Sequence, residues 1–135
     1  MKKRIISLLS TVVIVCIMCT PALANGPIEI EPCYEGASSV RATFNISASG
    51  KTTSTATVIV LPGYTADVYL DLQQNDDGWE NIMTWEDSGS GRIYLNKSYY
   101  VESGYEYRAQ VTVDIYDDDG SYVETVTVNS GSEWY

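Results

Sequence analysis

Residues 105–116 read Tyr-Glu-Tyr-Arg-Ala-Gln-Val-Thr-Val-Asp-Ile-Tyr, the longest unbroken alternation of apolar and polar side chains in the chain. Successive side chains of a β-strand point to opposite faces, so a period of two predicts a strand with one buried face. The buried face would carry the apolar members of this stretch: Tyr105, Tyr107, Ala109, Val111, Val113 and Ile115.

Six further strands are predicted on the same grounds, at residues 41–49, 51–61, 66–74, 79–86, 92–100 and 122–128. Short turn sequences separate them, among them Pro62-Gly63, Asp77-Gly78 and Asp119-Gly120. After residue 24 no window has helical spacing. The pattern predicts an all-β fold, an immunoglobulin-like antiparallel β-sandwich of about seven strands, with a small β-barrel as the alternative. Tyr105 and Tyr107 lie where such sandwiches often carry a tyrosine corner.

The first 24 residues have the layout of a cleavable signal peptide. A basic start, Met1-Lys2-Lys3-Arg4, precedes an apolar run and an Ala22-Leu23-Ala24 cleavage motif. An uncleaved membrane anchor is the competing interpretation, but the apolar run is shorter than the ~20 residues that a spanning helix needs. We therefore expect a secreted protein with an extended leader or edge strand at residues 25–40 and one sandwich domain at residues 41–135.

The exported part is strongly acidic. Residues 25–135 hold eighteen acidic and five basic residues, a net charge of −13. This charge disfavours nucleic acid and anionic membranes as partners. Cys33 is the single cysteine after the signal peptide, so no disulfide can form within the exported chain. It is expected to be a small packed residue, with pairing between two chains as the alternative.

Several segments resemble a group of small secreted proteins of Gram-positive bacteria. These are Leu72-Gln73, Trp79 after its acidic hairpin, Trp85, and the run from Tyr99 to Arg108. That group has no assigned activity. The resemblance therefore implies an exported single-domain β-sandwich and gives no catalytic residues to carry over.

The residue inventory argues against an enzyme. The exported part has no histidine and one cysteine, which excludes histidine-dependent nucleophilic catalysis and the usual zinc sites. A pair of carboxylates, as in glycoside hydrolysis, is the remaining catalytic option, but the acids are scattered over turns and outward strand faces. We predict no catalytic residues and no cofactor.

The acidic turns raise the question of calcium, which prefers carboxylate and carbonyl oxygens. Residues 114–120 lack the acid spacing of an EF-hand loop, and residues 75–78 are too few to form one. We therefore predict no metal site and interpret both turns as solvated hairpin tips. A weak calcium site at Asp117, Asp118 and Asp119, helped by Asp87, is the alternative.

Strands that run up and down in order would bring Tyr64, residues 87–91 and residues 117–120 to one end of the sandwich. Loops clustered on a rigid sandwich are a common binding surface. The predicted ligand-binding residues of this end are Tyr64, Asp87, Asp117, Asp118 and Asp119.

Aromatic residues are abundant, with eleven tyrosines and three tryptophans. Tyr69, Tyr94 and Tyr116 have the outward phase of their strands and could stack on sugars or anchor a protein. In contrast, the core is expected to take Trp79, Trp85, Tyr105 and Tyr107. The final pair, Trp134-Tyr135, either clamps the carboxyl end or hangs free.

These observations predict a noncatalytic binding or interaction module, monomeric, at or outside the bacterial cell surface, with an unknown protein or glycan as partner. Carbohydrate binding by exposed Tyr and Trp is one alternative. A secreted toxin-like or antagonistic peptide is the other.

Overall fold

The computed structural model describes residues 34–135. The predicted signal peptide and the leader as far as Cys33 lie outside these residues. Within the described part no helix is long and apolar enough to cross a bilayer.

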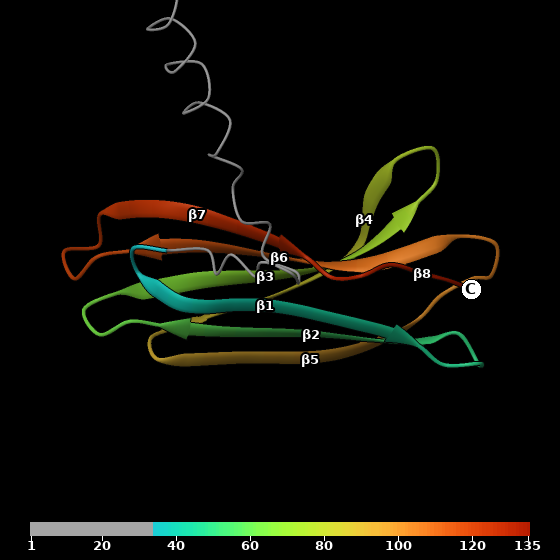
Figure 1. Ribbon diagram of the computed structural model, residues 1–135, viewed down its shortest axis with the longest axis horizontal. Helices are drawn as coiled ribbons and strands as arrows, with labels where there is room; N and C mark the ends of the chain where they lie inside the picture. The colour runs from blue at the N-terminus through green and yellow to red at the C-terminus, as the bar shows by residue number, and fades with distance from the viewer. Residues whose placement is uncertain (1–33) are drawn as a thin grey trace, which may run out of the picture. The chain divides into compact units, whose positions relative to one another are not determined.

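The described chain folds into eight β-strands (Figure 1): β1 (Ala37–Ile46), β2 (Lys51–Val60), β3 (Thr65–Asn75), β4 (Trp79–Gly89), β5 (Arg92–Tyr100), β6 (Glu106–Tyr116), β7 (Tyr122–Asn129) and β8 (Glu133–Trp134). The seven predicted strands are present. The first begins earlier than predicted, because a register shift between Ala37 and Ser39 hides its start from the alternation. It also ends earlier, at Ile46, because residues 47–50 form a turn in which Gly50 N–H donates to the Ser47 carbonyl.

The strands form two antiparallel sheets. A three-stranded sheet has the order β1-β2-β5, and a five-stranded sheet has the order β4-β3-β6-β7 with β8 beside β6. No strand pairing joins the two sheets in residues 34–135, so the prediction of a sandwich is confirmed and the small barrel was the wrong alternative. The chain passes from one sheet to the other between β2 and β3, β4 and β5, and β5 and β6.

The core lies between the sheets and is formed by the inward faces of the alternating strands. From β3 it takes Val68, Leu70 and Leu72, and from β6 Val111, Val113 and Ile115, all fully buried. The three-stranded sheet adds small and aliphatic side chains: Ala56, Val58, Val60, Ile93 and Leu95. The predicted alternation of β6 is therefore confirmed along its whole length.

Of the four aromatic residues expected in the core, Tyr107 is fully buried and Trp85 packs against the core from β4. The Tyr107 hydroxyl donates a 2.6 Å hydrogen bond to the Glu102 carbonyl oxygen, five residues upstream, as expected of a tyrosine corner. Tyr105 stays half-buried, with its ring at the edge of Tyr107.

Trp79 is not a core residue, so that prediction was wrong. Leu72 pairs with Met83 but the next residue, Gln73, pairs with Asn81, which leaves Ile82 as an extra residue in β4. Such a bulge reverses the phase of a strand. Trp79 thus faces outward with Gln73, and its ring lies 4.1 Å from the Arg108 guanidinium carbon.

The carboxyl end is clamped against the sandwich. Tyr135 N–H donates to the Tyr105 carbonyl, and Gly104 N–H donates to the Tyr135 carbonyl. The Glu133 side chain accepts a hydrogen bond from Ile46 N–H, which ties β8 to the opposite sheet. Trp134 itself is 71% exposed.

Candidate functional site

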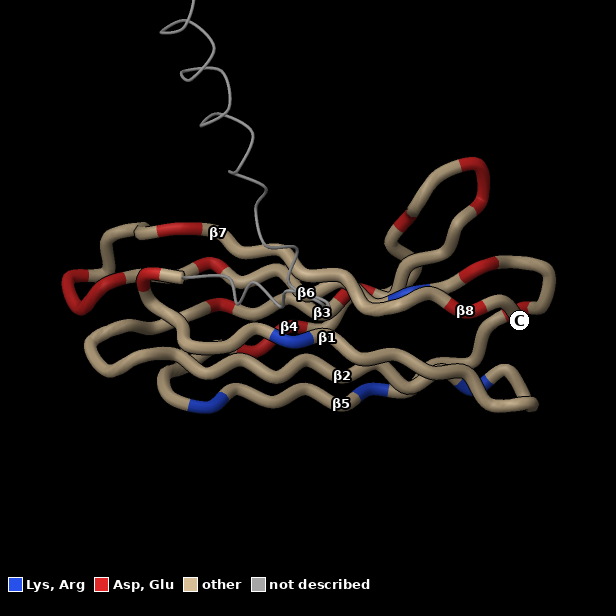
Figure 2. The backbone as a smooth tube through the Cα atoms, viewed as in Figure 1, with Lys and Arg blue, Asp and Glu red and all other residues tan. Residues whose placement is uncertain are grey.

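The strands of the two sheets carry charges of opposite sign (Figure 2). The strands of the three-stranded sheet carry no acid, and they hold four of the five basic residues of the described chain: Arg41, Lys51, Arg92 and Lys97. The strands of the five-stranded sheet carry nine acids and one arginine. The outer faces of the sandwich therefore differ in sign although the chain as a whole is acidic.

The outer face of the five-stranded sheet carries a group of acids and tyrosines that we call the acidic tyrosine patch. Its members come from β3, β4, β6 and β7: Asp67, Tyr69, Glu86, Asp114, Tyr116 and Tyr122. The register sets them side by side, with Tyr69 opposite Glu86 and Tyr116 opposite Tyr122. Antiparallel pairing thus gathers residues that are far apart in the sequence.

Two carboxylates of the patch face each other directly. Asp67 of β3 pairs with Asp114 of β6, and like charges in this position destabilise a sheet. The Thr125 hydroxyl donates a 2.6 Å hydrogen bond to Asp114 Oδ1 and lies 2.8 Å from the Tyr122 hydroxyl. These hydroxyl groups hold Asp114 in place, but they add no positive charge.

The pKa values of two tyrosines in the patch are raised by their surroundings. Partial burial, followed by the charges of Asp67, Asp114 and Glu86, raises the pKa of Tyr69. Partial burial and the charges of Asp114 and Asp67 likewise raise the pKa of Tyr116. Both side chains are therefore neutral at physiological pH, with flat rings beside carboxylates.

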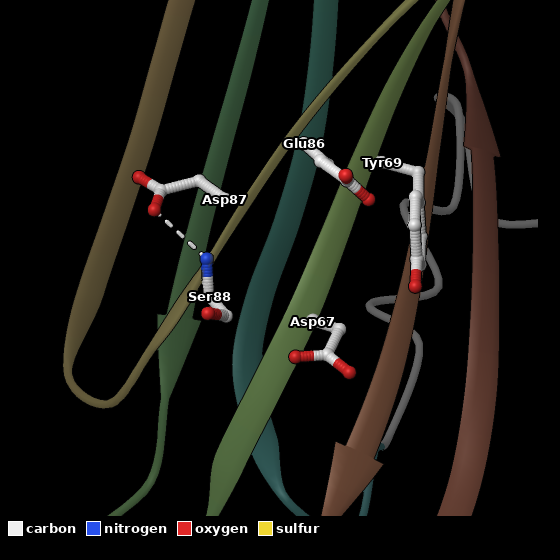
Figure 3. Close-up of a pocket in the computed structure, with 5 residues that line it drawn as sticks. All are labelled: Asp67, Tyr69, Glu86, Asp87 and Ser88. Atoms are coloured by element: carbon white, nitrogen blue, oxygen red, sulfur yellow. Dashed lines mark hydrogen bonds between the residues drawn. The ribbon is translucent and has the colours of Figure 1, made fainter.

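An open hollow of about 390 Å³ lies within the patch, lined by Asp67, Tyr69, Glu86, Asp87 and Ser88 (Figure 3). The carboxylates of Asp67 and Glu86 and the ring of Tyr69 come from neighbouring strands. Asp87 points away from them, and its carboxylate accepts a hydrogen bond from Ser88 N–H. Of the predicted site residues, Tyr69 and Tyr116 belong to this patch, whereas the Asp87 carboxylate points elsewhere.

The outer face of the three-stranded sheet carries a second group, which we call the basic tyrosine face: Arg41, Lys51, Arg92, Tyr94 and Tyr100. Tyr94 is 49% exposed, and the Arg92 guanidinium carbon lies 5.4 Å from the centre of its ring. Arg41 and Tyr94 flank Thr57 in one row across the sheet. The outward phase predicted for Tyr69, Tyr94 and Tyr116 is correct, but the three divide between two faces.

The loops at residues 61–64, 89–91 and 117–121 lie at one end of the sandwich (Figure 1), as the up-and-down order predicted. Tyr64 is half-buried and packs against the core at this end. Its ring lies beside Gly36, where a Cβ would come within 2.8 Å of it. Tyr64 therefore contributes to packing at this loop end.

Asp117, Asp118 and Asp119 bring their carboxylates within 4.8 Å of one another in the β6–β7 hairpin. The Asp117 carboxylate accepts hydrogen bonds from Asp119 N–H and Ser121 N–H, which is the usual task of an aspartate in a turn. Asp118 and Asp119 are exposed. Asp87 is not part of this carboxylate group.

Sequence reasoning did not single out the remaining members of the two outer faces. Alternation alone could assign an outward direction to Asp67, Glu86, Asp114 and Tyr122. Whether these side chains lie next to one another depends on which strands pair. The exposure of Tyr100, 67%, follows from its place near the end of an edge strand. A pairing order for β3, β4 and β6 would have been needed to find the patch.

No family model matches the chain, and no curated protein matches it.

Proposed function

We propose that this protein is an exported, noncatalytic binding module that captures a Lys/Arg-rich protein segment on the acidic tyrosine patch. The resemblance to small secreted proteins of Gram-positive bacteria and the signal-peptide pattern support export, and the open strand surface supports binding without catalysis. The site is an outer strand surface beside the loop end, and binding residues are often found at loops held by a rigid scaffold.

We also propose that the two-sheet sandwich has the immunoglobulin-like arrangement of strands. The strand orders β1-β2-β5 and β4-β3-β6-β7 fit the two sheets of such domains. The Tyr107 hydrogen bond to Glu102 supports the same assignment. In this fold the loops beside the patch correspond to the end at which antibody variable domains bind.

The observation that carries the proposal is the pairing of Asp67 with Asp114 beside Tyr69 and Tyr116. Two opposed carboxylates weaken a sheet, and a cation placed between them would remove that repulsion. Arginine is especially suited, because its planar guanidinium forms two parallel hydrogen bonds with a carboxylate and stacks on aromatic rings. Tyrosine supplies such rings at a low entropic cost.

The test is the affinity of the protein for a short Lys/Arg-rich peptide and for a Glu-rich peptide of the same length. The basic peptide should bind, and the acidic one should not. Binding should weaken as salt rises from 0.1 M to 1 M, because the Debye length falls from ~10 Å to ~3 Å. The double variant D67N/D114N should lose at least about tenfold in affinity, or ~1.4 kcal/mol.

A matched control removes two acids at the far end of the sandwich. D76N/D77N changes the net charge by the same amount in the exposed β3–β4 hairpin. Asp77 has φ 57°, a value that asparagine also adopts, so the turn should persist. Equal losses in the two variants would show a general charge effect and would reject the patch as the site.

Carbohydrate binding is a second candidate, favoured by the exposure of Tyr94 and Tyr100 on the other face. Their strand and its neighbours present hydroxyl and amide groups, including Thr55 opposite Asn96 and Thr53 opposite Ser98. A polysaccharide pull-down that depends on Tyr94, tested with Tyr94→Ala, would support it. Retention of the glycan by Tyr94→Ala would count against it.

A further inference from the structure

The cations on the three-stranded sheet lie among uncharged neighbours. Across the strands Arg41 pairs with Thr57, Arg92 with Ile59 and Lys51 with Tyr100. No strand of this sheet supplies a carboxylate. Arg41, Arg92 and the exposed ring of Tyr94 therefore present positive charge and a flat surface together on one side of the sandwich.

This group and the acidic tyrosine patch lie at the same end of the molecule. Arg92 follows the 89–91 loop directly, and Ile59, its cross-strand partner, comes shortly before the 61–64 loop. Asp67 comes shortly after that loop, and Glu86 shortly precedes Gly89. The two groups thus sit at matching heights on opposite outer faces.

We propose that the basic tyrosine face of one copy docks on the acidic tyrosine patch of a second copy, so that copies stack face to face in one direction. This inference rests on the proposed function, because it names the cationic partner of the patch. Arg41 and Arg92 of one copy would meet Asp67, Asp114 and Glu86 of the next, and Tyr94 would meet Tyr69.

The charge complementarity favours this occupant. Within residues 34–135, no cation pairs with Asp67 or Asp114 across the strands, and the cross-strand partners of Arg41 and Arg92 are uncharged. Simple translation along the stacking direction brings the two groups together, since both lie at the loop end. Because the two surfaces differ and lie on opposite sides, each docking leaves one free surface of each kind, and the stack does not close.

The size of the face sets the expected strength. Three strands ~4.8 Å apart, with about ten residues of ~3.3 Å each, give a face of about 475 Å². The two surfaces of a contact would then bury about 950 Å², less than the ~1,600 Å² of a typical stable complex. We therefore expect weak association that grows with protein concentration and falls with added salt.

The test uses two variants in mixture. R41Q/R92Q keeps only its acidic surface, and D67N/D114N keeps only its basic surface, so neither should stack alone. Mixed in equal amounts, they should form dimers and nothing larger, because each partner has one competent surface. The wild-type protein at the same concentration should form longer species. Sedimentation velocity distinguishes these states, and thermal melting shows that both variants remain folded.

Charge-matched controls are K97Q/R108Q for the basic variant, since Lys97 pairs with the inward-facing Ser54 and Arg108 lies on the other sheet outside the patch, and D76N/D77N for the acidic one. Both should associate as the wild type does, since neither changes the groups at the loop end. If the mixture stays monomeric where the wild type associates, or the wild type does not associate at all, the stacking proposal is overturned. The peptide experiment is run at a protein concentration too low for copies to associate, so the proposed function can survive that result.

Discussion

At the scale of single residues, the inward-facing side chains of β2 include two buried hydroxyl groups, of which one is hydrogen-bonded and the other is not. The Thr52 hydroxyl donates a 2.7 Å hydrogen bond to the Tyr99 carbonyl oxygen of β5. The Ser54 hydroxyl is fully buried and has no hydrogen-bond partner among the described residues. A buried polar group without a partner loses its hydration and gains nothing in return.

We predict that Ser54→Ala leaves the stability unchanged or raises it by up to about 1 kcal/mol, because the change removes an unsatisfied hydroxyl. Thr52→Val should instead lower it by about 0.5–1.5 kcal/mol, because the Tyr99 carbonyl loses its donor while the side chain keeps its shape. Urea unfolding of the two variants measures the difference. A clear loss of stability in Ser54→Ala would contradict the account of this residue.

At the scale of strands, alternation of side chains gave the positions of seven strands and the inward face of β3, β5 and β6. It failed where the period is broken. The extra residue Ile82 placed Trp79 on the outer face, and the shift near Ala37 concealed the start of β1. β8 is only two residues long, too short for any periodicity. The patch could not be predicted because alternation says which residues point outward but not which strands are neighbours.

The loop between β5 and β6 is fastened by the hydrogen bond from Tyr107 to Glu102. We predict that Tyr107→Phe, which keeps the buried ring and loses this bond, destabilises the fold by about 1 kcal/mol. For a domain of this size, that loss corresponds to a drop of about 4–8 °C in melting temperature.

The control for this prediction is Tyr105→Phe, which removes a neighbouring hydroxyl that makes no hydrogen bond in the described residues. Its melting temperature should change little. Equal shifts in the two variants would mean that the Tyr107 bond does not fasten the loop.

At the scale of the whole molecule, burial and acidic neighbours affect several tyrosines together. They raise the pKa of Tyr69 and Tyr116 on the patch. Burial, followed by the charges of Glu102 and Tyr105, raises the pKa of Tyr107 above its ordinary value of 10.0. In the unfolded chain these groups ionise near pH 10, before they do so in the folded protein.

The folded state keeps its full stability below about pH 10, where these tyrosines are neutral in both states. The free energy of unfolding then decreases as the pH rises from about 10 through the folded-state pKa values, because the unfolded chain releases these protons first. We therefore predict that the melting temperature falls above about pH 10. Phenolate absorbance should show late-titrating tyrosines, and D67N/D114N should move the titration of Tyr69 and Tyr116 to lower pH. A titration in which all tyrosines ionise together near pH 10 would contradict this prediction.

The unequal charge of the two sheets also makes the sandwich an electric dipole directed across its layers (Figure 2). Near a negatively charged surface such a body experiences a torque that turns its positive side inward. The three-stranded sheet would then turn toward that surface, at a distance set by the repulsion of the net negative charge, and the tyrosines and carboxylates of the other sheet would point toward the medium. Orientation at an interface would thus need no anchor of its own, and high ionic strength would abolish it.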